Sequence, residues 1–221
     1  MPRTFVIGDV HGCHQALSTL LTAIRPDPLQ DTLVFLGDYI DRGPESSQVL
    51  SALINLQGSS RNLIALMGNH EQMLLNYLAG LDQELYLSAG GIETLESYGI
   101  VNFGDIWTQT ILPPDHLDFL HSLRPYWEDD QHIYVHAGLE PGVHLTQQST
   151  DWLFWGREGF IDSDYDFGKR VIYGHTPWQA PRVEANKIGI DTGAVYGGRL
   201  TCLVLPEMEF VSVETVGGQP G

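Results

Sequence analysis

The chain has 221 residues, of which 28 are acidic and 11 are basic, and its formal net charge is -17. This length suits one compact domain, and so acidic a surface argues against nucleic acid or an anionic membrane as a partner. No apolar run approaches the roughly 18 residues that span a bilayer, and the N-terminus lacks a signal-peptide pattern, so we expect a cytoplasmic protein.

Apolar runs alternate with helical patterns in the first part of the chain. Strands are predicted at Thr4–Ile7, Leu33–Leu36 and Leu63–Leu66, and helices at His14–Ile24, Ser46–Leu56 and Glu71–Leu81. This alternation predicts an α/β fold in which parallel strands are covered by helices.

The middle of the chain, residues 77–127, has weaker periodicity and is expected to form a mostly helical insert. Further short strands are predicted at Ile133–Val135, Val171–Tyr173, Lys187–Ile190, Leu200–Leu205 and Phe210–Val213. These later strands are closely spaced along the chain, which favours antiparallel pairing. We expect a single domain over residues 1–216 and a disordered tail over residues 217–221.

Polar side chains follow five of the predicted strands where each one ends. They are Asp9 and His11, then Asp38 and Asp41, then Asn69 and His70, and later His136 and His175. Because ligands bind at the carboxyl ends of strands in open α/β sheets, these five segments should converge. The alternative is turn chemistry with accidental polar residues, but five matches in consistent context argue against it.

The donor types indicate the kind of metal. Mixed nitrogen and oxygen donors suit Mn, Fe or Zn better than Ca or Mg, and Cys13 and Cys202 are not arranged as thiolate ligands. Two metals about 3.5–4 Å apart can activate water and neutralise charge on phosphoryl oxygens, which would meet the demands of a slow reaction such as phosphate-ester hydrolysis. Asp38, in the central motif, is the expected bridging carboxylate. The histidines outside the motifs receive no role: His116, His121, His132 and His144.

These motifs, in this order, resemble the PPP family of metallophosphatases, calcineurin-like phosphoesterases that include protein serine/threonine phosphatases. The segments that carry the resemblance are Gly8–Gly12, Gly37–Gly43 and Gly68–Glu71, followed by His136 and His175. Five segments resemble the small bacterial and phage lambda-type members: Asn69–Met73, Ala89–Gly91, Trp155–Arg157, Gly174–Pro177 and Ile190–Val195. The resemblance implies a sandwich of mixed β-sheets flanked by helices, with a metal site at the carboxyl ends of the strands.

The resemblance also implies the ligands of two divalent metal ions. Asp9, His11 and Asp38 would hold the first ion. The second would be held by Asp38, Asn69, His136 and His175. Mn²⁺ is the expected metal, with Fe or Zn as alternatives.

Roles in catalysis follow from the same resemblance. Water activated by the two metals would attack phosphorus in line. His70 would protonate the leaving oxygen, and Asp41 would orient His70. The phosphate would be bound by Arg42, Arg157 and Asn69, since the arginine fork pairs two phosphate oxygens at once.

We therefore expect a metal-dependent phosphomonoester hydrolase, in particular a serine/threonine protein phosphatase, acting on phosphorylated protein or a small phosphoester. The alternative is symmetrical hydrolysis of a dinucleoside polyphosphate such as diadenosine tetraphosphate. That branch often lacks an aspartate at the position of Asp41 and tends to have aspartate where this chain has Glu71. A binding module without catalysis is a further alternative, but His70, Asp41 and both arginines argue against it. The oligomeric state is not indicated.

Overall fold

The computed structural model describes residues 2–100 and 112–215. The predicted tail, residues 217–221, and part of the predicted insert lie outside these ranges. None of the helices in the described ranges has the length and apolarity that crossing a bilayer requires.

Two mixed β-sheets face each other and form the centre of the fold. One has the order β10-β9-β1-β2-β3, and the other the order β4-β5-β6-β8-β7. The strands of the first are β1 (Thr4–Ile7), β2 (Thr32–Phe35), β3 (Asn62–Ala65), β9 (Arg199–Leu205) and β10 (Glu209–Glu214). Those of the second are β4 (Tyr126–Glu128), β5 (His132–Val135), β6 (Arg170–Tyr173), β7 (Arg182–Val183) and β8 (Lys187–Gly189).

The pairing of the early strands follows the prediction, and that of the later strands follows it in part. β1, β2 and β3 are parallel, and β10 pairs antiparallel with β9. The antiparallel expectation is wrong for β5, β6 and β8, which run parallel to one another. The chain leaves the sheet after β5 and forms α7 (Thr150–Trp155) and α8 (Glu158–Ile161), so β6 re-enters in the same direction.

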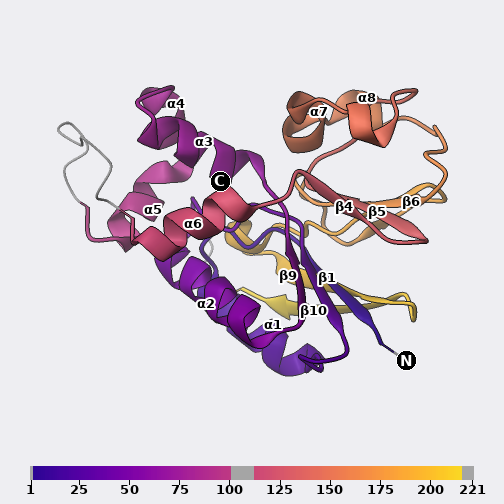
Figure 1. Cartoon of the computed structure of the whole chain (residues 1–221), viewed down its shortest axis with the longest axis horizontal. Helices are drawn as coiled ribbons and strands as arrows, with labels where there is room; N and C mark the ends of the chain where they lie inside the picture. The colour runs from indigo at the N-terminus through magenta and orange to yellow at the C-terminus, as the bar shows by residue number, and fades with distance from the viewer. Residues whose placement is uncertain (1, 101–111, 216–221) are drawn as a thin grey trace.

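Apolar side chains on alternate positions of the strands fill two separate cores. Val6 and Val34 point between the sheets and pack with Ile172. Their neighbours Phe5 and Ile7 point to the other face and pack against helices α1 (His14–Ile24) and α2 (Ser46–Ser59). Figure 1 shows α7 and α8 above the second sheet, and α1 and α2 beside the first.

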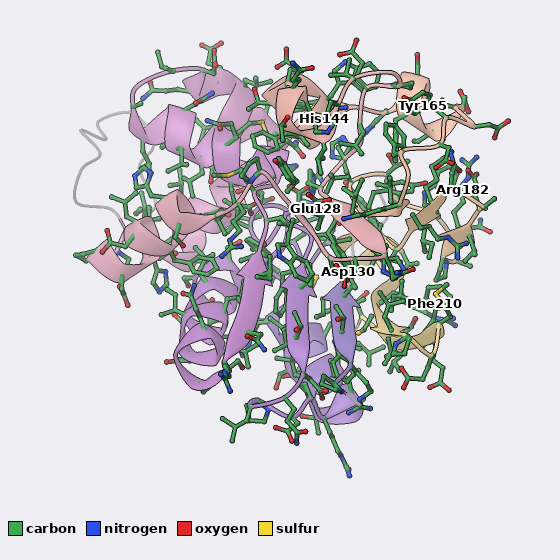
Figure 2. The ribbon with its side chains drawn as sticks, turned by 45° about the vertical axis from the view of Figure 1, so that its right-hand side comes forward. Glu128, Asp130, His144, Tyr165, Arg182 and Phe210 are labelled. Atoms are coloured by element: carbon green, nitrogen blue, oxygen red, sulfur yellow. The ribbon has the colours of Figure 1, made fainter. Side chains whose placement is uncertain are left out.

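The segment between β3 and β4 is helical in its described part. It contains α3 (Asn69–Leu78), α4 (Gln83–Tyr86), a π-helical turn η1 (Leu87–Gly91), α5 (Ile92–Ser97) and α6 (Pro114–Ser122). β4 begins at Tyr126, and its hairpin with β5 carries Glu128 and Asp130 (Figure 2).

Helix α3 begins at Asn69, two residues before the predicted start. The residue before the helix, Gly68, is extended, and the carboxylate of Glu71 accepts a hydrogen bond from the Gly68 N–H at 3.0 Å. This contact satisfies one of the unpaired N–H groups of the first turn. Asn69 and His70 therefore lie in the first turn of the helix, directly at the end of β3.

Candidate metal centre

The carboxyl ends of β1, β2, β3, β5 and β6 bring the predicted ligands together. All of them are buried, with at most 7% of each residue exposed: Asp9, His11, Asp38, Asn69, His136 and His175. Burying this many polar groups costs free energy unless each finds a partner. The hydrogen bonds and charges of the site show which partners the protein itself supplies.

Asp38 lies between two histidine groups. Its Oδ2 atom is 3.4 Å from Nε2 of His11, and its Oδ1 atom is 3.4 Å from Nε2 of His136. Two sets of potential ligand atoms share this carboxylate, one with His11 and His70 and the other with His136 and His175; within each set the atoms lie within 4.8 Å of one another. Each carboxylate oxygen thus faces a different set, as a bridging ligand requires.

The backbone orients the histidine rings. Nδ1 of His11 lies 2.8 Å from the carbonyl of Ile40, and Nδ1 of His136 lies 3.0 Å from the carbonyl of Leu36. A carbonyl only accepts hydrogen bonds, so Nδ1 carries the proton in both rings and the Nε2 lone pair points into the centre. Burial lowers the pKa of His11 to about 3, which keeps this ring neutral.

Asn69 and His175 complete the second set. Oδ1 of Asn69 lies 3.0 Å from Nε2 of His136, and Nδ1 of His175 lies 3.1 Å from the same nitrogen. Burial lowers the pKa of His175 to about 2. One amide oxygen and two neutral imidazoles therefore converge beside Asp38.

The environment of Asp9 indicates whether the centre is suited to divalent cations. Its Oδ2 atom accepts a hydrogen bond from the backbone N–H of His175 at 2.9 Å, but its buried Oδ1 atom has no partner within the described residues. Burial and the neighbouring charges of Asp191 and Asp38 raise the pKa of Asp9. Three carboxyl groups packed out of water, one of them with an orphaned oxygen, are chemically suited to divalent cations.

Asp38 is held in its charged form. Burial alone would raise the pKa of Asp38, but the positive charge that neighbouring histidines such as His136 and His11 gain in acid keeps it well below its usual range. Burial next to Asp38 raises the pKa of Asp191 to about 6. The central carboxylate therefore carries its negative charge at neutral pH.

An arginine lies at each end of the ligand cluster. Nη1 of Arg42 is 2.8 Å from Nε2 of His11, and Nε of Arg157 donates to Nε2 of His175 at 2.9 Å. Arg42 is half-buried and Arg157 is exposed. They place positive charge at the centre of a chain whose net charge is -17, where an anionic substrate would need it.

His70 and Asp41 form a buried pair beside the ligands. Nδ1 of His70 lies 2.7 Å from Oδ2 of Asp41, and neither side chain is more than 1% exposed. The Nδ1 atom is thus committed to Asp41, and His70 offers only Nε2 for other chemistry.

The loops that carry these residues are strained. His11, Asp38, Asp41, Arg42 and His175 all have positive φ, between 44° and 71°. A left-handed conformation costs roughly 1–3 kcal/mol for a residue with a side chain. It persists only where surrounding contacts determine it, and residues under such strain cluster at functional sites.

Glu71 supplies contacts that the sequence analysis did not assign. Its carboxylate accepts hydrogen bonds from the backbone N–H groups of Gly68 at 3.0 Å, Asp38 at 2.9 Å and Tyr39 at 2.7 Å. It therefore ties the loop after β2 to the loop after β3. Its position three residues after Gly68 at a helix start was the available signal, since a glutamate there reaches back to backbone N–H groups.

Two histidines that received no role lie away from the centre. His116 is buried between Tyr98, whose hydroxyl is 2.6 Å from Nδ1, and Ser51, whose Oγ is 3.1 Å from Nε2. His144, labelled in Figure 2, is exposed. Its Nδ1 atom contacts Thr146.

An open cavity of about 730 Å³ lies beside the chain segments that follow His175 and Asp191. Its walls include Pro177, Trp178, Thr192 and Tyr196. The ring of Tyr196 faces the guanidinium of Arg42, with 5.6 Å between the Arg42 Cζ and the ring centroid. Tyr196 therefore links the wall of the cavity to Arg42, one of the two arginines of the centre.

The sequence and the fold are similar to those of known phosphoesterases. The family model of calcineurin-like phosphoesterases matches residues 2–196. Serine/threonine-protein phosphatase 1 of Salmonella typhimurium is 34% identical over 214 residues, covering 90% of this chain and 90% of that protein. The asymmetrical bis(5'-nucleosyl)-tetraphosphatase PrpE of Halalkalibacterium halodurans is 29% identical over 238 residues, covering 94% and 92%. The crystal structure of a candidate diadenosine tetraphosphatase superposes with a TM-score of 0.78 at 24% identity, covering 99% and 97% of the two chains.

Proposed function

The chain belongs to the calcineurin-like phosphoesterase family and is a phosphoester hydrolase, and we propose that it acts as a metal-dependent serine/threonine protein phosphatase. The observation that carries this proposal is Asp38, buried between two ligand sets with an arginine at each end. The relative from Salmonella, which is named a serine/threonine-protein phosphatase, supports the substrate class because it aligns with 90% of this chain.

The six proposed metal ligands form two groups that share Asp38, and His70 belongs to neither. Asp9, His11 and Asp38 would hold one divalent ion, and Asp38, Asn69, His136 and His175 the other. When bound, two such ions supply Lewis-acid stabilisation of phosphoryl oxygens and lower the pKa of water. We propose Mn²⁺ as the native metal, with Fe or Zn as alternatives, because the donors mix imidazole nitrogen with carboxylate and amide oxygen.

The remaining residues bind the phosphate group and donate a proton to the leaving oxygen. Arg42 and Arg157 bind phosphoryl oxygens from opposite ends of the centre, assisted by the Asn69 amide. His70 donates a proton from Nε2 to the departing alkoxide oxygen, while its Nδ1 atom remains hydrogen bonded to Asp41. A serine or threonine alkoxide is a poor leaving group, so this proton transfer matters most for phosphomonoesters of alcohols.

We further propose that the protein works in the cytoplasm. Both of its cysteines, Cys13 and Cys202, are free thiols. Proteins of oxidising compartments rely on disulfides more often than cytoplasmic proteins do. The substrate would accordingly be a phosphorylated cytoplasmic protein.

Hydrolysis of dinucleoside polyphosphates is a second candidate function. The PrpE relatives are named asymmetrical bis(5'-nucleosyl)-tetraphosphatases and are about as similar as the protein phosphatase. The cavity of about 730 Å³ beside Arg42 has room for a nucleoside, and the aromatic rings of Trp178 and Tyr196 line it. The relatives' names specify asymmetrical cleavage, whereas the sequence resemblance pointed to the symmetrical reaction.

The deciding experiment compares two substrates with the same Mn²⁺-loaded protein. One is a phosphoserine peptide, assayed for phosphate, and the other is diadenosine tetraphosphate, assayed by chromatography. The proposal requires release of phosphate from the peptide at a kcat/KM well above that for the dinucleotide. Preference for the dinucleotide would refute it, and the products would separate symmetrical cleavage to two ADP from asymmetrical cleavage to ATP and AMP. Asp38→Asn is the control for contaminating phosphatases.

A further inference from the structure

The carboxylate of Asp41 is held by the helical segment between β3 and β4. Its Oδ1 atom accepts hydrogen bonds from the hydroxyl of Tyr86 at 2.9 Å and from the hydroxyl of Thr94 at 2.7 Å. Its Oδ2 atom faces Nδ1 of His70 at 2.7 Å. All four side chains are buried, none more than 1% exposed.

We propose that Tyr86 is a positioning residue of the reaction: with Thr94, it fixes the Asp41 carboxylate so that Oδ2 faces His70. This inference rests on the proposed role of His70 as the proton donor. A carboxylate rotates easily about its Cβ–Cγ bond, and two donors on one oxygen remove that freedom. The second oxygen is then held in the direction of His70.

The same segment also holds the strained backbone of the Asp41–Arg42 turn. The N–H of Asp41 donates to Oγ1 of Thr94 at 2.8 Å, and the N–H of Arg42 donates to the carbonyl of Gly90 at 2.9 Å. Asp41 and Arg42 have φ angles of 71° and 68°. Because two consecutive left-handed residues are unfavourable without external contacts, these bonds maintain the conformation that presents both side chains.

Two glycines permit this close approach and account for the Ala89–Gly91 motif. A β-carbon on Gly90, where φ is 108°, would lie 2.6 Å from Cγ of Arg42. A β-carbon on Gly91 would overlap the ring of Tyr86. Only residues without side chains let the segment pack against the turn and place the Tyr86 hydroxyl beside Asp41.

Tyr86→Phe tests the inference, because it removes the hydroxyl and keeps the ring. Tyr77→Phe is the matched control: its ring centroid is 4.9 Å from that of Tyr86, and its buried hydroxyl has no hydrogen-bond partner in the described part of the chain. Both variants lose one buried hydroxyl from the same cluster. Only Tyr86→Phe alters the support of Asp41.

The readout is the dependence of turnover on the leaving group. With Mn²⁺-loaded protein, we expect Tyr86→Phe to lower kcat for phenyl phosphate about tenfold, the size of one hydrogen bond to a charged group. The loss for 4-nitrophenyl phosphate should be much smaller, because that leaving group needs little protonation. Tyr77→Phe should match wild type on both substrates. Thr94→Val should behave as Tyr86→Phe does, and Thr94→Ser should restore the wild-type ratio.

A second readout does not depend on turnover. In metal-free protein, where no paramagnetic Mn²⁺ broadens the signal, the proton between Nδ1 of His70 and Asp41 should give a downfield ¹H NMR signal that Tyr86→Phe shifts and Tyr77→Phe leaves in place. An unchanged signal, an unchanged ratio of the two aryl phosphate rates, or equal losses on both substrates would overturn the inference. Wild-type protein that turns over no phosphomonoester would instead refute the proposed function, and the NMR comparison would still decide the role of Tyr86.

Discussion

The α-carbon of Gly174 lies against the carboxylate of Asp9, so that a β-carbon at position 174 would overlap Asp9 Oδ1. This oxygen is the buried acceptor that lacks a partner within the described residues. The end of β6 therefore defines the space in which Asp9 would bind a metal ion under the proposed function.

Gly174→Ala should displace the Asp9 carboxylate and lower the metal content. Gly58 in α2 offers a matched control, because a β-carbon there meets nothing within 4 Å. Gly58→Ala should keep full metal content and raise the free energy of unfolding by about 0.5–1 kcal/mol. Metal stoichiometry by elemental analysis, together with chemical denaturation, checks both. A Gly174→Ala protein with wild-type metal content would contradict this account.

Asp38→Asn should lose both metal ions, because a single carboxylate faces both ligand sets and the amide removes its charge. Metal content should fall from about two ions per chain to less than one. Asp164 is exposed, and Asp164→Asn is therefore the control for loss of one negative charge. Retention of both ions in Asp38→Asn would show that another residue bridges them.

His70→Asn should keep its metal and lose turnover by roughly 10²–10⁴-fold on alkyl phosphates, the usual contribution of a general acid. The loss should shrink on 4-nitrophenyl phosphate, whose leaving group is stable as an anion. The exposed His144 provides the control substitution His144→Asn. Metal loss in His70→Asn would instead make His70 a ligand, in keeping with its position near His11 and Asp38.

Metal affinity should rise with pH between about 5 and 8. Burial and acidic neighbours raise the pKa of Asp9, and burial raises that of Asp191 to about 6, so these carboxyls retain protons in the metal-free protein at mildly acid pH. A bound cation favours the carboxylate, so binding expels those protons and weakens as pH falls. His11 and His175, with pKa values of about 3 and 2, are already neutral and release none.

Calorimetric titration with Mn²⁺ in two buffers of different ionisation enthalpy measures the protons released. We expect release at pH 6 and less at pH 8. Equal release at both values, or none at pH 6, would contradict the assignment to carboxyl groups.

In the metal-free protein, the same carboxyl groups should make the free energy of unfolding depend on pH. Below their ordinary pKa near 4 these groups are protonated in both folded and unfolded chains. As pH rises through their raised folded pKa values, the metal-free fold loses stability, because the unfolded chain releases those protons more readily.

The local features of the site were readable from the sequence. Strand β1 is apolar at Phe5, Val6 and Ile7 and is followed by Gly8 and Asp9, so the end of the strand and the start of the ligand loop can be identified without the fold. The same holds for β2 and Asp38, since strand periodicity and turn residues are properties of a few consecutive positions.

The parallel course of β5, β6 and β8 could not be predicted from spacing alone. Close spacing favours hairpins, as between β9 and β10, whereas the long chain between Val135 and Arg170 contains α7 and α8 and crosses over. The outcome depends on how those helices pack on the sheet, which involves residues remote in the sequence.

The type of fold and the side chains that gather at the centre could thus be predicted from the sequence, because apolar periodicity and glycine-flanked polar residues are local patterns. The folded structure fixed the mutual orientation of those side chains. It turned one oxygen of Asp38 toward each histidine set, directed the Nε2 atoms inward through backbone carbonyls, and brought Tyr86 across 45 positions to Asp41. Hydrogen-bond direction and the satisfaction of buried charge depend on atoms that meet only when distant segments pack.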